Sequence, residues 1–485
     1  MRIKIMQCNK LYYGDNLHVL EKSIKDDSVD LIYLDPPFNS KADYNVLFKE
    51  PTGVASEAQI TAFEDTWHWG QETEIALQRI VDRATVDVVE TMVAFKRFLK
   101  RNDMMAYLVM MCVRLIELRR VLKDTGSIYL HCDPTASHYL KIVMDAIFGV
   151  KNFRNEIVWC YRGGGTPRKD FGRRHDVILR YSKTNDYLFY SDPVRVPYQA
   201  EGIERTDDAM WGKHKGTDKV YKPHPLGKVP EDWWSMNILN ANDPERLGYQ
   251  TQKPGTLLER IVNASSKEGD LVLDPFCGCG TTVAVAQKLN RQWIGIDITH
   301  LATNLIKLRL KCLFDLEPKR DYDVTGEPED LTGATELALQ NRYQFQWWAT
   351  SLINARPYGD KKRGKDTGID GILSFSDEKD KVKKAIVSVK SGKVSVKDVR
   401  DLGHVMEREK SEIGILVALT SPTCDMTSEA AAKGLYRSET FFRDYARIQL
   451  FTIEELLSGK KPDVPNPVSP FKRAQWSDNT DNGLF

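Results

Sequence analysis

The chain has 485 residues, of which 41% are hydrophobic and 28% charged, and its net charge is +1. This length exceeds what one hydrophobic core usually serves, so two or three domains are expected, and the composition excludes fibrous and disordered classes. Neither an apolar leader nor an apolar run long enough to span a bilayer is present, and the cysteines are scattered, so a cytoplasmic protein without membrane contact is predicted.

The first predicted elements alternate between strand and helix. Apolar runs predict strands over residues 29–34 and 127–131, and helical periodicity predicts a long helix over 104–122 between them. Such alternation is typical of a largely parallel α/β sheet with helices on both faces. Residues 42–100, rich in Glu, Thr and Trp, are predicted to form an insertion over the sheet edge.

The region of about 151–250 loses this periodicity and gains Gly, Pro and basic side chains. Between residues 151 and 180 there are eight Lys and Arg against three Asp and Glu. A local positive excess suits contacts with nucleic-acid phosphates, although a solvated charged loop has the same composition.

A compact strand–turn–helix–strand unit follows at residues 270–298. The charged stretch over 317–335, which contains Pro and Gly, is interpreted as a linker. Beyond it a second, smaller α/β unit is predicted, with a helix that begins at an N-cap near Ser395. Its predicted strands cover residues 372–375, 385–389, 413–419 and 448–452.

The motif Asp35-Pro36-Pro37-Phe38 comes directly after the first predicted strand. Parallel sheets bind ligands at the carboxyl ends of their strands, and two prolines make this turn rigid because each ring fixes φ. The Asp35 carboxylate and main-chain carbonyls could accept both N–H bonds of an exocyclic base amine, with Phe38 as a stacking face. On these four residues alone, an exposed tight turn explains the pattern equally well.

A second motif lies in the 270–298 unit, where Asp274 ends a strand and Gly278 and Gly280 precede a helix. Glycines there let the backbone approach a bulky ligand. Asp297 ends the next strand, and a carboxylate at such a position suits the hydroxyls of a ribose. The loop lacks the G-x-G-x-x-G spacing, which disfavours a nicotinamide cofactor.

These motifs together resemble the amino-methyltransferases of DNA with the permuted "beta" order, in which the catalytic motif precedes the cofactor motif. Further segments match in the same order, over roughly residues 9–315. They are Gly14-Asp15-Asn16, residues 127–133, residues 176–183 and Thr251-Gln252-Lys253-Pro254 with the residues that follow it. The resemblance implies a Rossmann-like methyltransferase sheet with helices on both faces.

The same resemblance implies S-adenosyl-L-methionine as methyl donor and double-stranded DNA as substrate, with the target base flipped against the catalytic residues Asp35, Pro36, Pro37 and Phe38. Direct transfer needs no metal and no covalent enzyme intermediate. An aspartate-first, Phe-ended motif leans toward N6 of adenine over N4 of cytosine, and a homodimer stays open because related enzymes often dimerise. The implied cofactor-binding residues are Asp15, Lys253, Asp274, Phe276, Gly278, Gly280, Thr281 and Asp297.

Cys277 and Cys279 depart from the residues common in this loop. A C-x-C pair without further paired ligands is weak evidence for zinc. Buried small side chains are therefore the preferred interpretation.

The second α/β unit resembles the Mrr branch of the restriction-endonuclease-like fold. Asp370 and Lys390 fit two positions that flank a divalent metal there, with Mg²⁺ as the implied ion, but Ser388 between them is a poor ligand for a hard cation. A cleaving module with a borrowed ligand and a domain that binds DNA without cutting both fit, and the second is favoured. Alternatively, Asp370 merely caps a turn before a strand.

The predicted organisation is a methyltransferase domain over 1–316 with target recognition at about 151–250, the linker over 317–335, an endonuclease-fold domain over 336–460 and a tail over 461–485. The predicted function is site-specific methylation of DNA at adenine N6. The alternatives are methylation of N4 of cytosine, a combined restriction–modification polypeptide with a metal-dependent endonuclease, and methylation of RNA or of a protein amide.

Overall fold

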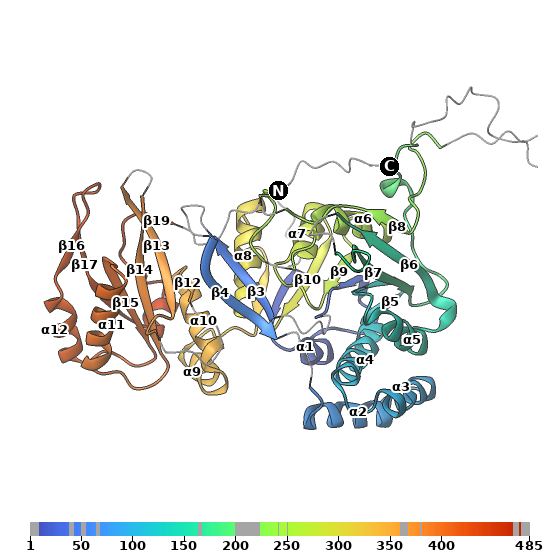
Figure 1. Cartoon of the computed structure of the whole chain (residues 1–485), viewed down its shortest axis with the longest axis horizontal. Coiled ribbons are helices and arrows are strands. Elements are labelled where there is room, and N and C mark those ends of the chain that lie inside the picture. The colour runs from blue at the N-terminus through green and yellow to red at the C-terminus, as the bar shows by residue number, and fades with distance from the viewer. Residues whose placement is uncertain are drawn as a thin grey trace, which may run out of the picture.

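The computed structural model describes residues 9–37, 43–49, 55–64, 68–162, 167–198, 224–240, 242–249, 251–358, 367–378, 381–468 and 475–476. Two sheets, each with its own helices, lie side by side along the long axis of the molecule (Figure 1). In these ranges, the structure contains no helix with the length and apolar character needed to cross a membrane.

Over the described residues, the larger sheet has nine strands in the order β11-β1-β10-β9-β2-β5-β7-β6-β8. The strands from β11 to β5 run parallel to their neighbours, and β7 is antiparallel to both β5 and β6. The predicted largely parallel α/β sheet is therefore confirmed. The strands are β1 (Lys10–Tyr13), β2 (Val29–Leu34), β5 (Leu122–Cys132), β6 (Phe153–Cys160), β7 (His175–Ser182), β8 (Trp233–Ser235), β9 (Leu271–Asp274), β10 (Gln292–Asp297) and β11 (Asp323–Thr325).

Helices cover both faces of this sheet, as predicted. Successive side chains of β2 point to opposite faces, so Leu31 and Tyr33 enter one apolar core and Ile32 and Leu34 the other. The core with Ile32 is covered by α1 (Asn16–Ser23), α4 (Asp103–Val121) and α5 (Ser137–Phe148). The core with Leu31 is covered by α6 (Gly255–Ser265), α7 (Thr281–Lys288) and α8 (His300–Phe314).

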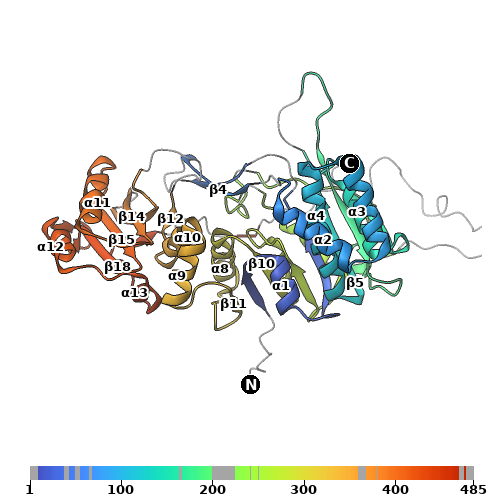
Figure 2. The same cartoon turned by 90° about the horizontal axis from the view of Figure 1, so that it is seen from below.

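The insertion predicted for residues 42–100 contains two kinds of structure. The strands β3 (Asp43–Lys49) and β4 (Ala55–Glu64) pair with each other in a separate antiparallel ribbon. The helices α2 (Gln71–Arg83) and α3 (Val86–Leu99) pack beside α4 and α5 on one face of the larger sheet (Figure 2).

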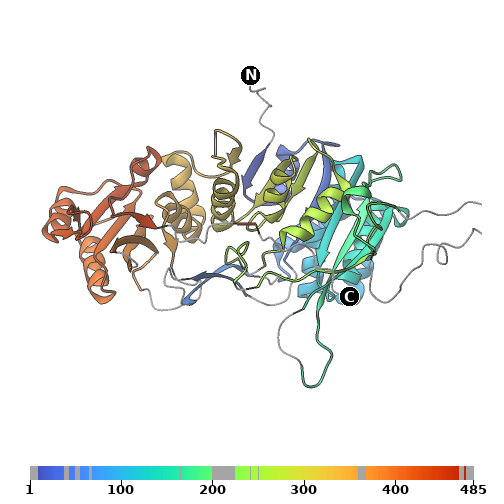
Figure 3. The same cartoon turned by 90° about the horizontal axis from the view of Figure 1, so that it is seen from above.

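The described parts of residues 151–250 are more regular than their sequence suggests, because β6, β7 and β8 belong to the larger sheet. Short 3₁₀ turns, η1 (Val150–Asn152) and η2 (Asp192–Val194), flank this pair of strands. The loop that joins β6 to β7 projects from the body of the molecule (Figures 2 and 3). Phe171 in this loop is 97% exposed.

The stretch interpreted as a linker contains β11, which pairs in parallel with β1, and the fully buried Tyr322. The larger sheet therefore extends beyond residue 316. The linker interpretation does not anticipate this strand, because three residues are too few to show a strand period.

Among the described residues, the smaller sheet has six strands in the order β12-β13-β14-β15-β18, with β19 paired to β13. The predicted strands are present, and Ser395 is the N-cap of α11 as predicted. The strands are β12 (Arg356–Pro357), β13 (Gly371–Glu378), β14 (Lys381–Lys390), β15 (Ile413–Ala418), β18 (Ile448–Thr452) and β19 (Pro467–Val468), and β16 (Leu435–Arg437) pairs with β17 (Asp444–Ala446) in a separate ribbon.

The smaller sheet is also covered on both faces. One face carries α9 (Leu331–Gln340), α10 (Arg342–Leu352) and α13 (Ile453–Leu457), and the other carries α11 (Val396–Arg408) and α12 (Cys424–Ala432). The two parts meet where Trp347 of α10 packs with Leu301 and Leu305 of α8. In the tail, the ring of Trp476 lies 6.5 Å from that of Phe314 at the end of α8.

Candidate active site

Four neighbouring parallel strands, β1, β10, β9 and β2, end at the same edge of the larger sheet. Tyr13 at the end of β1 is in register with Asp297 at the end of β10, and Leu273 of β9 is in register with Ile32 of β2. The residues that follow these strands therefore come together at one edge, which is where α/β sheets bind ligands.

A cavity opens at this edge. Its wall includes Asp35, Pro36 and Pro37 from one predicted motif, and it includes the residues around Asp274 and Asp297 from the other. The structure thus brings the two motifs into one cavity, although 239 residues separate Asp35 from Asp274 in the sequence. The remaining catalytic candidate, Phe38, lies outside the described residues. Predicted cofactor-binding residues on the wall are Asp15, Lys253, Asp274, Phe276, Gly278, Thr281 and Asp297.

The carboxylate of Asp35 has one anchored and one available oxygen. Its Oδ2 accepts a hydrogen bond from Nζ of Lys253 at 2.5 Å, whereas Oδ1 is buried with no hydrogen-bond partner in the part of the chain that the structure describes. Lys253, predicted as a cofactor contact, thus places its ammonium group on the acceptor turn. The arrangement leaves Oδ1 as an acceptor for a donor that enters the cavity.

The loop after β9 depends on two glycines. Gly278 and Gly280 have φ angles of +49° and +76°, a region that side chains rarely adopt. A Cβ at Gly280 would lie 2.6 Å from a side-chain atom of Ile306, and one at Gly278 would lie 3.2 Å from the ring of Tyr249. Gly278 is on the cavity wall, whereas Gly280 is the N-cap of α7 and supports the loop from behind.

Two further carboxylates on the wall receive main-chain hydrogen bonds. Asp297 accepts from the N–H of Gly278 at 3.0 Å and from both N and Oγ1 of Thr299 at 2.9 Å, and Asp274 accepts from the N–H of Phe276 at 3.1 Å. Burial nevertheless raises the pKa of Asp274 to about 7 and that of Asp297 to about 6. Donor groups of a ligand would stabilise the ionised form of both.

Asp15 lines the cavity and also stabilises the segment that carries it. Its carboxylate caps α1 by accepting from the N–H of Leu17 at 2.7 Å, and it pairs with Arg114 at 2.9 Å. The neighbouring Asn16 donates to the carbonyl of Pro275 at 2.7 Å and accepts from Arg114 at 2.6 Å. These bonds tie the Gly14-Asp15-Asn16 segment to the loop after β9, and sequence reasoning missed Arg114 because it lies in the middle of a helix.

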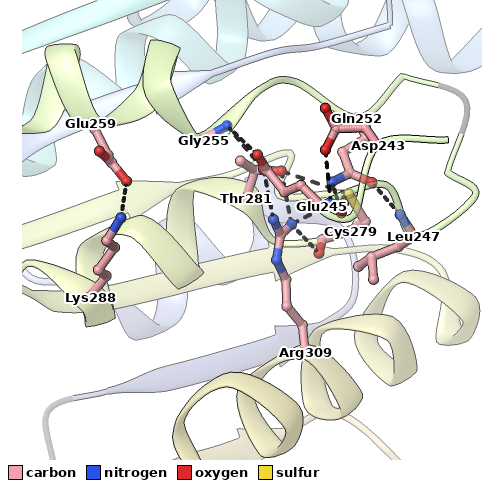
Figure 4. A network of polar contacts seen from close by, with 10 residues as sticks. All are labelled: Asp243, Glu245, Leu247, Gln252, Gly255, Glu259, Cys279, Thr281, Lys288 and Arg309. Carbon is pink, nitrogen blue, oxygen red and sulfur yellow. Dashed lines mark hydrogen bonds and ion pairs between the residues drawn. The ribbon is translucent and has the colours of Figure 1, made fainter. Parts of the chain in front are cut away.

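A buried ion pair holds the segment that carries Lys253 against the same loop (Figure 4). Arg309 of α8 lies 3.2 Å from the carboxylate of Glu245 and also donates to Oγ1 of Thr281 at 3.0 Å. Glu245 in turn accepts from the N–H of Gly255, the first residue of α6, at 3.0 Å. Both side chains are almost fully buried, at 1% and 5% exposure. Neither residue stands out in the sequence.

Cys277 and Cys279 are both buried, in two different apolar clusters. Burial raises the pKa of both thiols. Their surroundings agree with the preferred interpretation as small buried side chains.

The basic run over 151–180 divides into two groups. The guanidinium groups of Arg154 and Arg180 lie over aromatic rings, 4.0 Å from Tyr187 and 4.6 Å from Phe189, and Arg180 is buried. Both residues support the fold, and the burial of Arg180 makes it unsuited to contact a phosphate. The basic residues that are exposed in the described part of the loop between β6 and β7 are Arg162, Arg168, Lys169 and Arg173.

The two nuclease-like candidates lie at one end of the β13–β14 pair. Oδ2 of Asp370 accepts from the N–H of Val389 at 2.6 Å and lies 3.5 Å from Oγ of Ser388. The ammonium of Lys390 lies 3.8 Å from Asp398, the residue that closes the capping box of α11. The Asp370 carboxylate therefore has a structural contact with the main chain of β14, and its predicted role beside a divalent metal stays a prediction.

A largely parallel sheet with helices on both faces and a cavity at its carboxyl edge defines a Rossmann-like fold of the methyltransferase type. The family model for N6 and N4 DNA methylases matches residues 29–307, so the chain belongs to the DNA methylase family. A second model, described as NACHT-associated inactive restriction endonuclease 1, matches residues 345–458. It confirms the predicted restriction-endonuclease-like second part.

Individual relatives agree with this family. The chain is 31% identical over 297 residues to the type II methyltransferase M.BglII of Bacillus subtilis, and the alignment covers 60% of this chain and 65% of M.BglII, less than two thirds of that protein. It is 28% identical over 309 residues to the DNA adenine methyltransferase YhdJ of Escherichia coli (strain K12), with 63% of this chain and 83% of YhdJ covered. The solved structure of PvuII DNA methyltransferase (cytosine-N4-specific) superposes with a TM-score of 0.39 at 14% identity, over 62% of this chain and 85% of that one.

Proposed function

We propose that this protein is a site-specific DNA methyltransferase that transfers a methyl group from S-adenosyl-L-methionine to an exocyclic base amine, N6 of adenine. The observation that carries this proposal is the one cavity whose wall includes both the Asp35 turn and the segment from Asp274 to Asp297. Direct transfer requires that the methyl donor and the acceptor amine are bound next to each other, which one shared cavity allows.

The residues on the wall fit a cofactor that bears a ribose and a charged amino-acid group. Gly278 leaves the space that a Cβ would fill beside Tyr249. Asp274 and Asp297 offer carboxylate oxygens to hydroxyl and ammonium donors, while Asp15, Phe276 and Thr281 complete this side of the wall. The bound cofactor would supply an electrophilic methyl group on sulfur.

The acceptor turn would hold the base. Oδ1 of Asp35 is buried without a partner among the described residues and would accept one N–H of the amine. Pro36 and Pro37 have no N–H group, so the main chain of this turn presents carbonyl oxygens without competing donors. One of these oxygens would accept the second N–H of the base amine. Two accepted hydrogen bonds orient the amine with its lone pair toward the methyl group, so that positioning and electrostatics supply the catalysis.

Adenine is favoured over cytosine by the aspartate-first motif and by the similarity to YhdJ, which is named a DNA adenine methyltransferase. The experiment is transfer of labelled methyl groups to unmethylated genomic DNA, followed by nucleoside analysis. N6-methyladenine is expected as the product, and N4-methylcytosine would overturn the choice of base. Competition with RNA tests the substrate class, since RNA should not reduce transfer to DNA. A homodimer and a cytoplasmic location stay predictions.

For the second part of the chain, we propose DNA binding without cleavage. Support comes from Ser388 at the expected ligand position, from the bond between the Asp370 carboxylate and the main chain of Val389, and from the family match to an inactive endonuclease. Plasmid DNA incubated with Mg²⁺ should stay intact. Mg²⁺-dependent cleavage that Lys390→Ala abolishes would establish the alternative of a combined restriction–modification polypeptide.

A further inference from the structure

A chain of three polar side chains leads from the cavity into the core of the larger sheet. Tyr33 lies on β2 and Asp35 follows directly after the end of this strand, and both are on the cavity wall. The hydroxyl of Tyr33 lies 2.9 Å from Nδ1 of His131, and Nε2 of His131 lies 3.2 Å from the carboxylate of Asp176. Tyr33 and His131 are 2% and 0% exposed.

The chemistry of these groups fixes where the protons lie. Although burial acts in the opposite direction, the hydrogen bond from His131 and the positive charge of Lys253 hold the pKa of Asp176 below its ordinary value. An ionised carboxylate only accepts hydrogen bonds, so Nε2 of His131 carries the proton that faces Asp176. Nδ1 of the neutral ring then has a lone pair, and the hydroxyl of Tyr33 donates to it.

Such a group of buried polar side chains is costly unless its members are bonded to one another. Trp159 packs edge-on against His131, with ring centroids 5.5 Å apart and an interplanar angle of 87°. Tyr161 donates to the second oxygen of Asp176 at 3.2 Å. The imidazole is therefore held between a carboxylate, which stabilises its protonated form, and the hydroxyl group of Tyr33, a residue of the cavity wall.

Methylation of a neutral amine leaves a proton to be removed. Transfer forms an N–C bond and breaks an S–C bond whose electron pair stays on sulfur, so the nitrogen carries a positive charge until it loses one N–H proton. Both oxygens of Asp35 are engaged in this arrangement, Oδ1 by the amine and Oδ2 by the ammonium of Lys253, so a second group is needed to carry the proton away. The imidazole of His131 lies directly behind Tyr33, 2.9 Å from its hydroxyl oxygen, and an imidazole nitrogen with a lone pair can accept a proton.

We propose that Tyr33, His131 and Asp176 form the proton-accepting relay of this active site, an inference that rests on the proposed methyltransferase function. The oxygen of Tyr33 takes the proton from the methylated amine while its own hydroxyl proton passes to Nδ1 of His131. The result is an imidazolium ion paired with the Asp176 carboxylate. After the product leaves, the imidazolium returns its proton through Tyr33 to water that enters the cavity, which restores the resting state.

The test uses the full chain, S-adenosyl-L-methionine and an unmethylated DNA duplex. Tyr33→Phe keeps the ring and removes only the relay oxygen, and Asp176→Asn keeps the shape of the side chain and removes its charge. We expect each to lower kcat by roughly 100-fold, the contribution typical of a general base, with little change in KM for DNA or cofactor. The matched control is Tyr129→Phe, which removes a buried hydroxyl bonded to Ser265 in the same core and should retain kcat.

A spectroscopic readout separates the relay from a purely structural role. The ¹⁵N resonances of His131 should show the proton on Nε2 in the wild-type protein and a changed tautomer in Asp176→Asn. A folded Tyr33→Phe variant that retains kcat, or a wild-type His131 with its proton on Nδ1, would overturn the relay. Absence of any methyl transfer by the wild-type protein would instead refute the proposed function, and the ¹⁵N measurement would still report on the relay geometry.

Discussion

The ammonium of Lys253 lies 2.5 Å from Oδ2 of Asp35, although the two residues are 218 positions apart in the chain. Both side chains are largely buried, at 11% and 16% exposure. The pair links the segment before α6 to the turn after β2, so it joins the two sides of the cavity. It also decides which oxygen of Asp35 is available to a substrate.

Replacing Asp35 tests the acceptor turn directly. We expect Asp35→Ala to abolish methyl transfer and to leave cofactor binding largely intact, because the carboxylate faces the amine and the cofactor contacts come from other strands. The two quantities are measured by incorporation of labelled methyl groups and by isothermal titration calorimetry. Substantial residual turnover in a variant that binds cofactor normally would contradict the role proposed for Asp35.

Lys253→Gln and Lys253→Met both remove the positive charge of Lys253, so a comparison of the two isolates the hydrogen bond to Asp35. Lys253→Gln can still donate to Oδ2 of Asp35, whereas Lys253→Met cannot and leaves a mostly buried carboxylate without this partner. We therefore expect the rate of methyl transfer to fall further in the Met variant than in the Gln variant. Equal rates in the two variants would mean that the orientation of Asp35 does not depend on this bond.

The raised pKa values of Asp274 and Asp297 predict a pH dependence of stability. Both values, about 7 and about 6, lie above the ordinary value of 3.8 for an aspartate, because burial disfavours the charged form. The folded protein without ligand thus binds these protons more tightly than the unfolded chain does. Their stabilising effect is complete below the ordinary value and is lost as the pH rises through about 6 and 7.

Urea unfolding of the ligand-free protein at a series of pH values measures this effect. The side chain at position 297 of the Asp297→Asn variant does not titrate, so the free energy of unfolding of this variant should fall less steeply than that of the wild type between about pH 4 and about pH 6. Parallel curves for the two proteins would show that the Asp297 pKa is not raised in solution.

The sequence could predict the strands that are buried on both faces and the residues at their ends. Val29–Leu34 is apolar apart from Asp30 because helices cover both faces of β2, and the turn chemistry of Asp35 and Gly278 is local. Their meeting in one cavity follows from strand order, which single-sequence patterns do not contain. It was predictable through the family resemblance, because the order of motifs implies the order of strands.

Other parts of the site could not be predicted because their signals are not local. Arg309 and Glu245 are ordinary charged residues until the fold buries both and places them 3.2 Å apart. The same holds for Arg114, whose helical surroundings show nothing unusual. The strand β11 was not predicted because three residues are too few to show a strand period. The structural roles of Arg154 and Arg180 were not predicted because a basic run has the same sequence pattern whether its side chains are buried or exposed.

The buried pair of Arg309 and Glu245 predicts a large loss of stability when only one partner is removed. Arg309→Met should lower the free energy of unfolding by about 3–5 kcal/mol, because Glu245 is left buried without its counter-charge. Denaturant unfolding measures the change. As a control, Lys288→Met breaks the more exposed pair with Glu259 (Figure 4) and should cost no more than about 1 kcal/mol.

A double variant distinguishes charge burial from loss of packing at this pair. Arg309→Met combined with Glu245→Leu removes both charges, so part of the lost stability should return. If the double variant were less stable than Arg309→Met by the full cost of a second core defect, the unpaired carboxylate would not explain the loss. Cofactor affinity should follow the same order, since the pair supports Thr281 and the loop after β9.

The loop between β6 and β7 predicts a salt-dependent contribution to DNA binding. Arg168, Lys169 and Arg173 are exposed in the loop that follows β6, at the carboxyl edge of the sheet. Each contact with a phosphate releases counterions, so replacing one of these residues by Ala should reduce the slope of log K against log salt by about 1. Fluorescence anisotropy with a labelled duplex at several salt concentrations measures the slope.

Lys25→Ala is the matched control, because this exposed residue precedes β2 and so lies at the opposite edge of the sheet. Equal slopes for the wild type and the loop variants would place the DNA on another face.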